Sequence, residues 1–229
     1  MQFTIITLFP EVVTPILSSS ILGRAQKKNK ITVKTLNLRE FGIGRHRTVD
    51  DKPYGGGVGM VLRVDVLDQA IAAARIKGRR EAVILIDPKG IVYKQEVVET
   101  LAKGYDHLIL VCGHYEGFDE RIREYVDLEI SIGDYVLSGG EIAAAAIVES
   151  VARLVPGVLV KEEAPIKESF SKTSAGRILE APCYTRPAVY KGKKIPKELL
   201  SGNPELVEAY RKTQAEKLTA KRRPDLLRK

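Results

Sequence analysis

Short apolar segments alternate with stretches of helical periodicity over the first 160 residues, and this alternation limits the folds open to the chain. The strand-like segments are rich in β-branched residues and span residues 3–8, 31–38, 81–87 and 106–113. Helical patterns occupy residues 64–78 and 94–104, between these segments. This order is typical of βα units wound around a mostly parallel sheet. We therefore expect an α/β fold for residues 1–160.

The remaining residues follow a different pattern. An Ala-rich helical stretch stops at Pro156-Gly157, and residues 161–176 are polar without periodicity, which is typical of an inter-domain linker. Helical patterns return from about Pro196, and Asn203-Pro204 is suited to begin a new helix. The sequence thus predicts three parts: a large domain at 1–160, a linker at 161–176 and a small all-α domain at 177–229.

The charge is unevenly distributed between these parts. Residues 161–229 contain 17 Lys and Arg against 9 Asp and Glu, which accounts for the whole net charge of +8. A neutral body with a basic C-terminal part indicates a polyanionic partner for that part. The alternative is an ordinary solvated charged face.

Several classes of protein are disfavoured by the composition. The sequence contains no run of about 18 apolar residues, so we expect no transmembrane helix. The N-terminal residues lack the features of a signal peptide. Cys112 and Cys183 match no metal or redox spacing, so we expect two reduced thiols in a cytoplasmic protein. With only three histidines in the chain, a zinc site is not expected.

Four glycine-containing stretches stand at or after strand ends, at residues 45–60, 87–90, 112–121 and 132–141. In an open α/β sheet, ligands bind outside the carboxyl ends of the strands, and glycine allows the main chain to approach them closely. Each stretch alone could be a tight turn, but the repetition favours a binding site. The stretches fit neither a phosphate-binding P-loop nor a dinucleotide-binding fingerprint.

Five motifs together resemble the bacterial tRNA (guanine-N1)-methyltransferase family. They are RHRTVDDKPYGGGVGM, CGHYEGFDER, SIGDYVLSGGE, ARLVPGVL and YTRP, and the resemblance extends over essentially the whole chain. It implies a SPOUT-type parallel sheet with a deep trefoil knot, which is a rare exception among folds. It also implies a homodimer that uses S-adenosylmethionine to methylate the guanine just 3′ of the anticodon.

The same resemblance implies where the cofactor binds. Its adenine edge would be bonded by main-chain groups of the glycine-containing loops, for which small residues leave room. The matching residues are Asp87, Pro88, Gly113, Glu116, Ile132, Gly133, Asp134, Tyr135, Val136, Leu137, Gly139 and Gly140. Asp134 could instead orient the loop or face the substrate.

The resemblance also implies two catalytic residues. Guanine N1 must lose a proton, and the negative charge that spreads onto O6 must be stabilised. The family's base belongs to an Asp-Ser-Phe motif, which here reads Glu168-Ser169-Phe170, so Glu168 is the matching acid. Arg153 would stabilise O6, although a helix-end arginine can also pair with the helix dipole. Glu162 and Glu163 are the rival bases.

The resemblance assigns a further set of residues to tRNA binding: His46, Arg47, Asp50, Tyr54, Ser169, Thr185 and Arg186. His114 stands where the family commonly has arginine, which leaves one fewer fixed charge beside the pocket. The family also depends on magnesium, but no carboxylate cluster in the sequence specifies a dedicated site, and we expect no protein metal centre. A SPOUT enzyme with another RNA target and an inactive RNA-binding relative are the competing interpretations.

Overall fold

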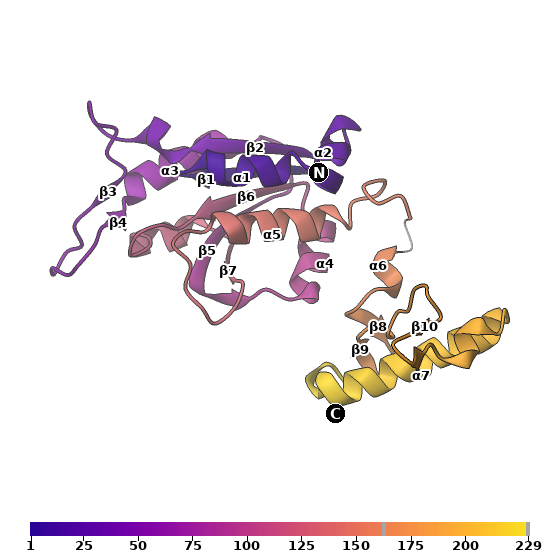
Figure 1. The fold of residues 1–229 in the computed structure, drawn as a ribbon. Helices are drawn as coiled ribbons and strands as arrows, with labels where there is room; N and C mark the ends of the chain where they lie inside the picture. Colours follow the sequence, from indigo (N-terminus) through magenta and orange to yellow (C-terminus); the bar gives the residue numbers. More distant parts are fainter. Residues whose placement is uncertain (162–163, 228–229) are drawn as a thin grey trace. The chain divides into compact units, whose positions relative to one another are not determined.

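The computed structural model describes residues 1–161 and 164–227, so Glu162 and Glu163 lie outside the described residues. The chain forms two compact units, Met1–Val160 and Lys161–Lys229. Figure 1 labels the helices and strands of both units.

Unit 1 is built on a five-stranded parallel sheet, as the alternating sequence pattern predicts. Its strands are β1 (Gln2–Thr7), β2 (Thr32–Asn37), β5 (Glu81–Val92), β6 (His107–Cys112) and β7 (Leu128–Ser131), in the order β2-β1-β6-β5-β7. The register sets Phe3 of β1 opposite Leu108 of β6, and Val83 of β5 opposite Ile109. The four predicted strands are confirmed, and β7 is an additional strand.

Helices cover both faces of this sheet because its central strands are apolar on both sides. Ile84 and Leu108 belong to one hydrophobic cluster, whereas Val83 and Ile109 belong to another. The first cluster also contains residues of α1 (Pro10–Leu17), α2 (Ser20–Lys27), α4 (Gln95–Gly104) and α5 (Glu141–Ala152). The second contains residues of η1 (Leu38–Phe41), α3 (Val64–Ala74) and η2 (Glu120–Tyr125). This two-sided covering is the usual arrangement of a parallel sheet.

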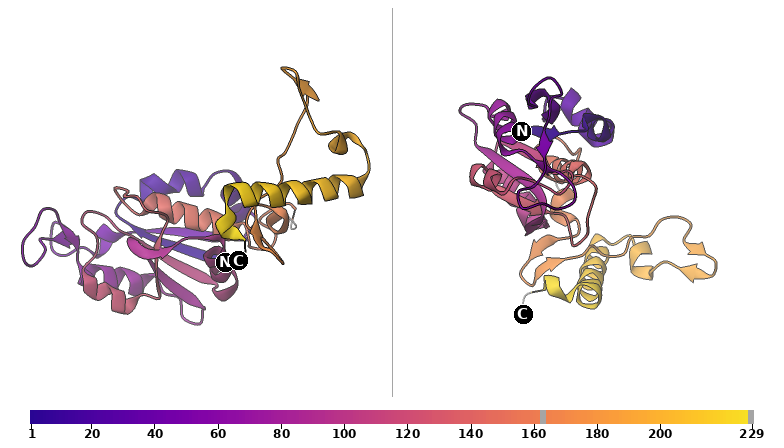
Figure 2. Two further views of the ribbon diagram at one scale, coloured as in Figure 1. Left: turned by 90° about the horizontal axis from the view of Figure 1, so that it is seen from below. Right: turned by 90° about the vertical axis from the view of Figure 1, so that its left-hand side faces the viewer.

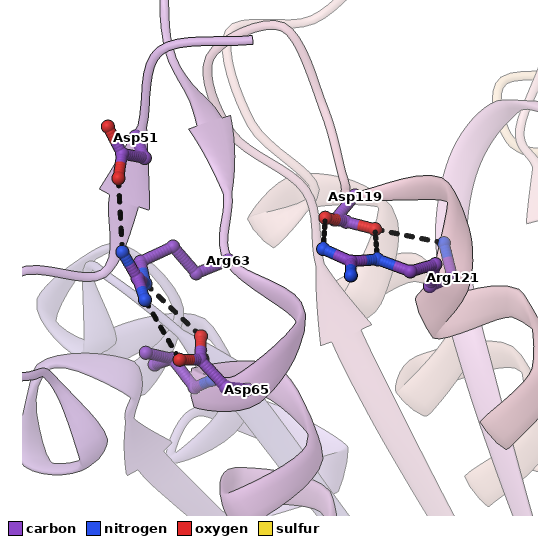
Figure 3. A network of polar contacts seen from close by, with 6 residues as sticks. Asp51, Arg63, Asp65, Asp119 and Arg121 are labelled. Atoms are coloured by element: carbon purple, nitrogen blue, oxygen red, sulfur yellow. Dashed lines mark hydrogen bonds and ion pairs between the residues drawn. The ribbon is translucent and has the colours of Figure 1, made fainter. Parts of the chain in front are cut away.

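A long loop of unit 1 connects the short strands β3 (Asp50–Asp51) and β4 (Val61–Leu62) and projects from the sheet (Figure 1). Arg63, just before α3, fastens its base: the guanidinium donates to Asp51 at 3.0 Å and to Asp65 at 2.9 Å (Figure 3). Asp119 and Arg121 form a neighbouring pair at 2.7 Å (Figure 3). The loop is therefore anchored at its base by charged groups.

Unit 2 combines one long helix with short helices and hairpins. Asn203 caps α7 (Pro204–Arg222) by accepting a hydrogen bond from Glu205 N at 2.9 Å, as predicted. The other elements are α6 (Ala164–Lys167), β8 (Ser171–Thr173), β9 (Gly176–Ile178), β10 (Val189–Tyr190), β11 (Lys193–Lys194), η3 (Lys197–Leu200) and η4 (Pro224–Leu226). Figure 2 shows this unit from two further sides.

Two expectations for the C-terminal part need correction. The domain is not all-α, since β8–β9 and β10–β11 are antiparallel hairpins. Residues 161–176 are also not a stretch without secondary structure, because α6, β8 and the start of β9 lie there or overlap it. Strands of two or three residues are too short to give a periodic sequence pattern, which is why they were not predicted.

No helix among the described residues is both long and apolar enough to span a membrane. The trefoil knot implied by the resemblance stays a prediction, since strand order and register alone do not establish threading of the chain.

Candidate cofactor pocket and catalytic residues

A cavity of about 320 Å³ lies at the carboxyl end of the parallel sheet of unit 1. Its walls are the bulge within β5, at residues 86–89, and the segments at the ends of β6 and β7, at residues 113–118, 130–133 and 135–140. This volume lies at the lower end of the range typical of small-molecule sites. The three corresponding glycine-containing stretches of the sequence thus converge on one pocket.

The first wall is a bulge in β5. Ile86 and Ile91 both pair with Ile130 of β7, so residues 87–90 leave the ladder between them. A Cβ on Gly90 would lie 2.4 Å from the main-chain carbon of Glu129, so only glycine allows the strand to rejoin its neighbour.

Asp87 holds this bulge in place. Its Oδ1 accepts a hydrogen bond from Lys89 N at 2.8 Å, and its Oδ2 accepts one from Arg123 of η2 at 3.0 Å. Arg123 also pairs with Glu120 and Glu129. Burial lowers the pKa of Arg123, but the hydrogen-bonded carboxylates of Glu120 and Asp87 outweigh burial, so the pKa is raised. Arg123 therefore remains a cation among three carboxylates.

The other walls bring main chain close to main chain. Gly140 N donates to Gly113 O at 2.9 Å, and a Cβ on Gly140 would lie 2.9 Å from Cys112 Cα. Gly133 has a φ of +149°, and a Cβ there would meet the ring of Tyr135 at 2.7 Å. Gly140 therefore lets two loops around the pocket approach each other main chain to main chain, because any side chain there would collide with backbone.

Several titratable side chains line the cavity, among them Asp87, His114 and Glu116, and one of them has a buried atom without a hydrogen bond. His114 Nδ1 is buried and makes no hydrogen bond to any described residue. Glu141, at the start of α5, is buried and accepts a hydrogen bond from Thr7 Oγ1 at 2.6 Å. Burial, reinforced by the negative charge of Glu141, raises the pKa of the Cys112 thiol well above its ordinary value. Cys112 therefore stays protonated and is no nucleophile.

The structure gathers nearly all the residues predicted to bind the cofactor around this one cavity. Of the twelve, only Asp134 does not line it, and its side chain is exposed. The sequence reasoning did not select several lining residues, among them Lys89, Tyr115, Phe118 and Ser138. Their only sequence signal is that they lie within the glycine-containing stretches.

The two predicted catalytic residues belong to different compact units. Arg153 directly follows α5 in unit 1 and is partly buried. Glu168 lies between α6 and β8 in unit 2, where its carbonyl accepts a hydrogen bond from Ser171 N at 3.1 Å. It lines a cavity of about 650 Å³ within unit 2, together with residues of α7.

The residues predicted to contact tRNA are also divided between the units. His46 and Arg47 lie in an exposed turn, Asp50 is in β3, and Tyr54 is fully exposed in the long loop after it. In unit 2, Ser169 Oγ accepts a hydrogen bond from Glu180 N at 3.1 Å. Thr185 and Arg186 are exposed there.

In the described part of the chain, no group of three or more His, Cys, Asp or Glu side chains could hold a metal ion.

Comparison with known proteins identifies the family. The profile of the tRNA (Guanine-1)-methyltransferase TrmD family matches residues 1–229. The chain is 48% identical to the tRNA (guanine-N(1)-)-methyltransferase of Geobacillus kaustophilus, over 99% of this chain and 91% of that protein. It is 49% identical to the enzyme of that name from Anoxybacillus flavithermus (99% and 91%) and 48% identical to that from Bacillus subtilis (100% and 93%). The chain belongs to the tRNA (Guanine-1)-methyltransferase TrmD family.

Proposed function

We propose that this protein transfers a methyl group from S-adenosylmethionine to N1 of the guanine just 3′ of the anticodon in tRNA. The proposal rests on the pocket that glycine-containing segments form at the carboxyl end of the sheet. It rests also on the match to this family over the full length of the chain. We further propose the knotted chain path of the SPOUT class for residues 1–160.

The pocket fits the adenosine part of the cofactor. An adenine edge needs closely placed N–H and C=O groups, which the segment 132–140 and Gly113 can offer where no Cβ intervenes. Leu137, Ile132 and Phe118 supply apolar surface for the flat base. When bound, S-adenosylmethionine would supply a methyl group on a sulfonium, which a deprotonated ring nitrogen can attack.

The protein's own residues then act on the guanine. Glu168 takes the N1 proton, and the N1 electron pair forms the new bond to the methyl carbon as the carbon–sulfur bond breaks. The guanidinium of Arg153 stabilises the negative charge that develops on O6, for which its planar pair of donors is suited. Both roles rest on the family resemblance together with the acid and the cation that this chain retains.

We propose that two copies of the chain form each active site. Because Arg153 and Glu168 belong to separate compact units, a homodimer can combine the pocket of one copy with Glu168 of the other. A tRNA-modifying activity further predicts the cytoplasm as the compartment.

The first experiment measures methyl transfer from labelled S-adenosylmethionine to a tRNA transcript with or without guanine at the target position. We expect transfer only with guanine, and Glu168→Gln should lower the single-turnover rate about 10²–10⁴-fold while cofactor affinity is kept. Glu168→Asp should retain substantial activity because the carboxylate remains. If Glu162→Gln or Glu163→Gln is inactive while Glu168→Gln is not, the assignment of the base is wrong.

Co-expression of Arg153→Ala and Glu168→Gln chains tests the shared site. If the two residues of a site come from different copies, a mixed dimer keeps one complete site and regains activity. If one copy supplies both residues, the mixed dimers stay as inactive as the single variants.

A further inference from the structure

The hairpin β10–β11 of unit 2 is a rigid, basic projection. Its two-residue turn is Lys191-Gly192, with φ values of +49° and +77°. Positive φ at both central residues is the requirement of a type I′ turn, which suits the twist of a hairpin. Tyr190 pairs with Lys193 and Val189 with Lys194. Ile195 N donates to Ala188 O at 3.1 Å and extends the ladder by one pair.

Tyr190 presents its ring to solvent in this hairpin. It stands next to the turn and its relative exposure is 63%, and tyrosine combines apolar ring area with a polar hydroxyl, which is why it is enriched at interfaces. Lys191 Nζ lies 5.5 Å from the centroid of the ring, a cation–π contact that orients it. Figure 2 shows the hairpin projecting away from α7 within this unit.

Two lysines, Lys191 and Lys193, lie on the side of the exposed ring, and Lys194 is on the opposite face of the hairpin. Residues directly opposite in an antiparallel pair have their side chains on the same face, so Lys193 shares a face with Tyr190. Lys191, Lys193 and Lys194 are all exposed and lie within four consecutive positions. An exposed aromatic ring among closely spaced cations is the arrangement by which proteins bind unpaired nucleotides: the base stacks on the ring and cations contact the phosphates.

We propose that Tyr190 is a stacking residue for an unpaired nucleotide of the tRNA substrate, with Lys193 and its neighbours binding the adjacent phosphates. The proposal rests on the tRNA substrate of the proposed function and adds a contact that is independent of the methyl-transfer chemistry. A surface that binds protein through Tyr190 would more often set the ring in an apolar patch than among three lysines.

The chain contains no tryptophan, which allows a direct test. Tyr190→Trp introduces a single tryptophan, and stacking on a base quenches its fluorescence. We expect saturable quenching on titration with tRNA, with an apparent affinity that falls as salt increases. Leu200→Trp is the matched control, because Leu200 has nearly the same exposure, 62%, in the same unit but outside the hairpin. It should show little quenching.

Affinity measurements complete the test. Tyr190→Ala should weaken tRNA binding about 5- to 150-fold, while Tyr190→Phe, which keeps the ring, should bind nearly as the parent does. Lys193→Ala should reduce the slope of log affinity against log salt by about 1. All three variants should keep the unfolding midpoint and the cofactor affinity of the parent, because the altered side chains are exposed and lie in unit 2.

Two results would overturn the proposal. One is an unquenched tryptophan at position 190 in a Tyr190→Trp protein that still methylates tRNA. The other is a fluorescence shift that follows protein concentration without RNA, which would place the residue in an interface between copies. If instead the parent protein methylates no tRNA, the proposed function fails, whatever the fluorescence shows.

Discussion

The two ends of the parallel sheet in unit 1 treat polar groups in opposite ways. At the amino end, His107 is fully buried and bonded on both sides, to Thr4 Oγ1 at 2.8 Å and to Glu81 Oε1 at 2.7 Å. At the carboxyl end, the strands run into glycine-containing loops around a cavity, and the buried Nδ1 of His114 has no partner among the described residues. The histidine at the amino end thus has both ring nitrogens hydrogen-bonded within the protein, whereas the one at the carboxyl end has a buried nitrogen that is not.

This difference indicates that ligand binding is confined to the carboxyl end of the sheet. Parallel strands all end at the same edge, so loops there can gather around a ligand without disturbing the ladder. Polar side chains at the opposite edge bind no ligand, so neighbouring strands can supply all their hydrogen-bond partners. Substitutions at the amino end should therefore change the free energy of unfolding alone, whereas those at the carboxyl end should also change cofactor binding.

The largest expected effect concerns Arg123, the partly buried cation that pairs with Asp87 of the pocket wall. Arg123→Met would leave Asp87 buried without its partner, and breaking such a pair costs about 3–5 kcal/mol of unfolding free energy. Cofactor affinity should also fall, because Asp87 positions the bulge at residues 87–90. Urea unfolding and cofactor titration measure the two effects.

Glu120→Gln is the matched control for Arg123→Met. Glu120 contacts the same guanidinium, but its side chain is 72% exposed, so its loss should cost less than about 1 kcal/mol. Equal losses from the two variants would mean that burial of the Arg123–Asp87 pair is not what stabilises this wall.

The next effect concerns the space that glycine leaves in the pocket. Gly140 has a φ of −79°, which alanine can adopt, so Gly140→Ala adds only a methyl group, 2.9 Å from Cys112 Cα. The resulting displacement of the loop should lower kcat/KM about 100-fold. Gly104→Ala, where a Cβ meets nothing within 4 Å, is the control and should leave kcat/KM unchanged. Unchanged kinetics in Gly140→Ala would show that this loop does not shape the site.

Much of unit 1 could be predicted from sequence because its strands and helices carry their own periodicity. β1 and β6 are rich in β-branched and apolar residues, and α3 and α4 bury one side, so local patterns sufficed. β7 was missed because its four residues, Leu128–Ser131, merge with the glycine-containing loop that follows. The hairpins of unit 2 are fixed by turns and pairing rather than by apolar periodicity.

The repeated glycine-containing stretches predict a binding site at the carboxyl ends of the strands, but its ligand and individual residues could be predicted only through the family motifs. A single glycine does not reveal whether it serves a turn or a close approach, and the need for Gly90 arises from β7, about 40 residues away in the chain. Asp87 was predicted as a pocket residue, but its pairing with Arg123 depends on folding that brings η2 beside β5. Such contacts between distant segments leave no local signal in the sequence.

A smaller effect is expected at the amino end. His107→Leu would leave the buried hydroxyl of Thr4 without its partner and cost about 1–3 kcal/mol of unfolding free energy. Adding Thr4→Val should restore part of this loss, since the double variant has no buried hydroxyl left without a hydrogen bond at position 4. Both proteins should keep the parent's cofactor affinity, as calorimetric titration would show. A large loss of affinity would contradict the separation of the two ends.

The smallest effect is the pH dependence of an exposed pair at the amino end. The hydrogen-bonded guanidinium of Arg80 lowers the pKa of Asp106 from 3.8 to about 2. Because this pKa is lower in the folded state, the pair stabilises the fold above the unfolded pKa, and the contribution is lost as pH falls through about 2. The difference in unfolding midpoint between the parent and Arg80→Gln should thus be present near neutral pH and shrink between about pH 4 and pH 2. It should also shrink with added salt, since both side chains are substantially exposed, at 64% and 40%. A midpoint difference that is independent of both pH and salt would show that Arg80 acts through packing rather than charge.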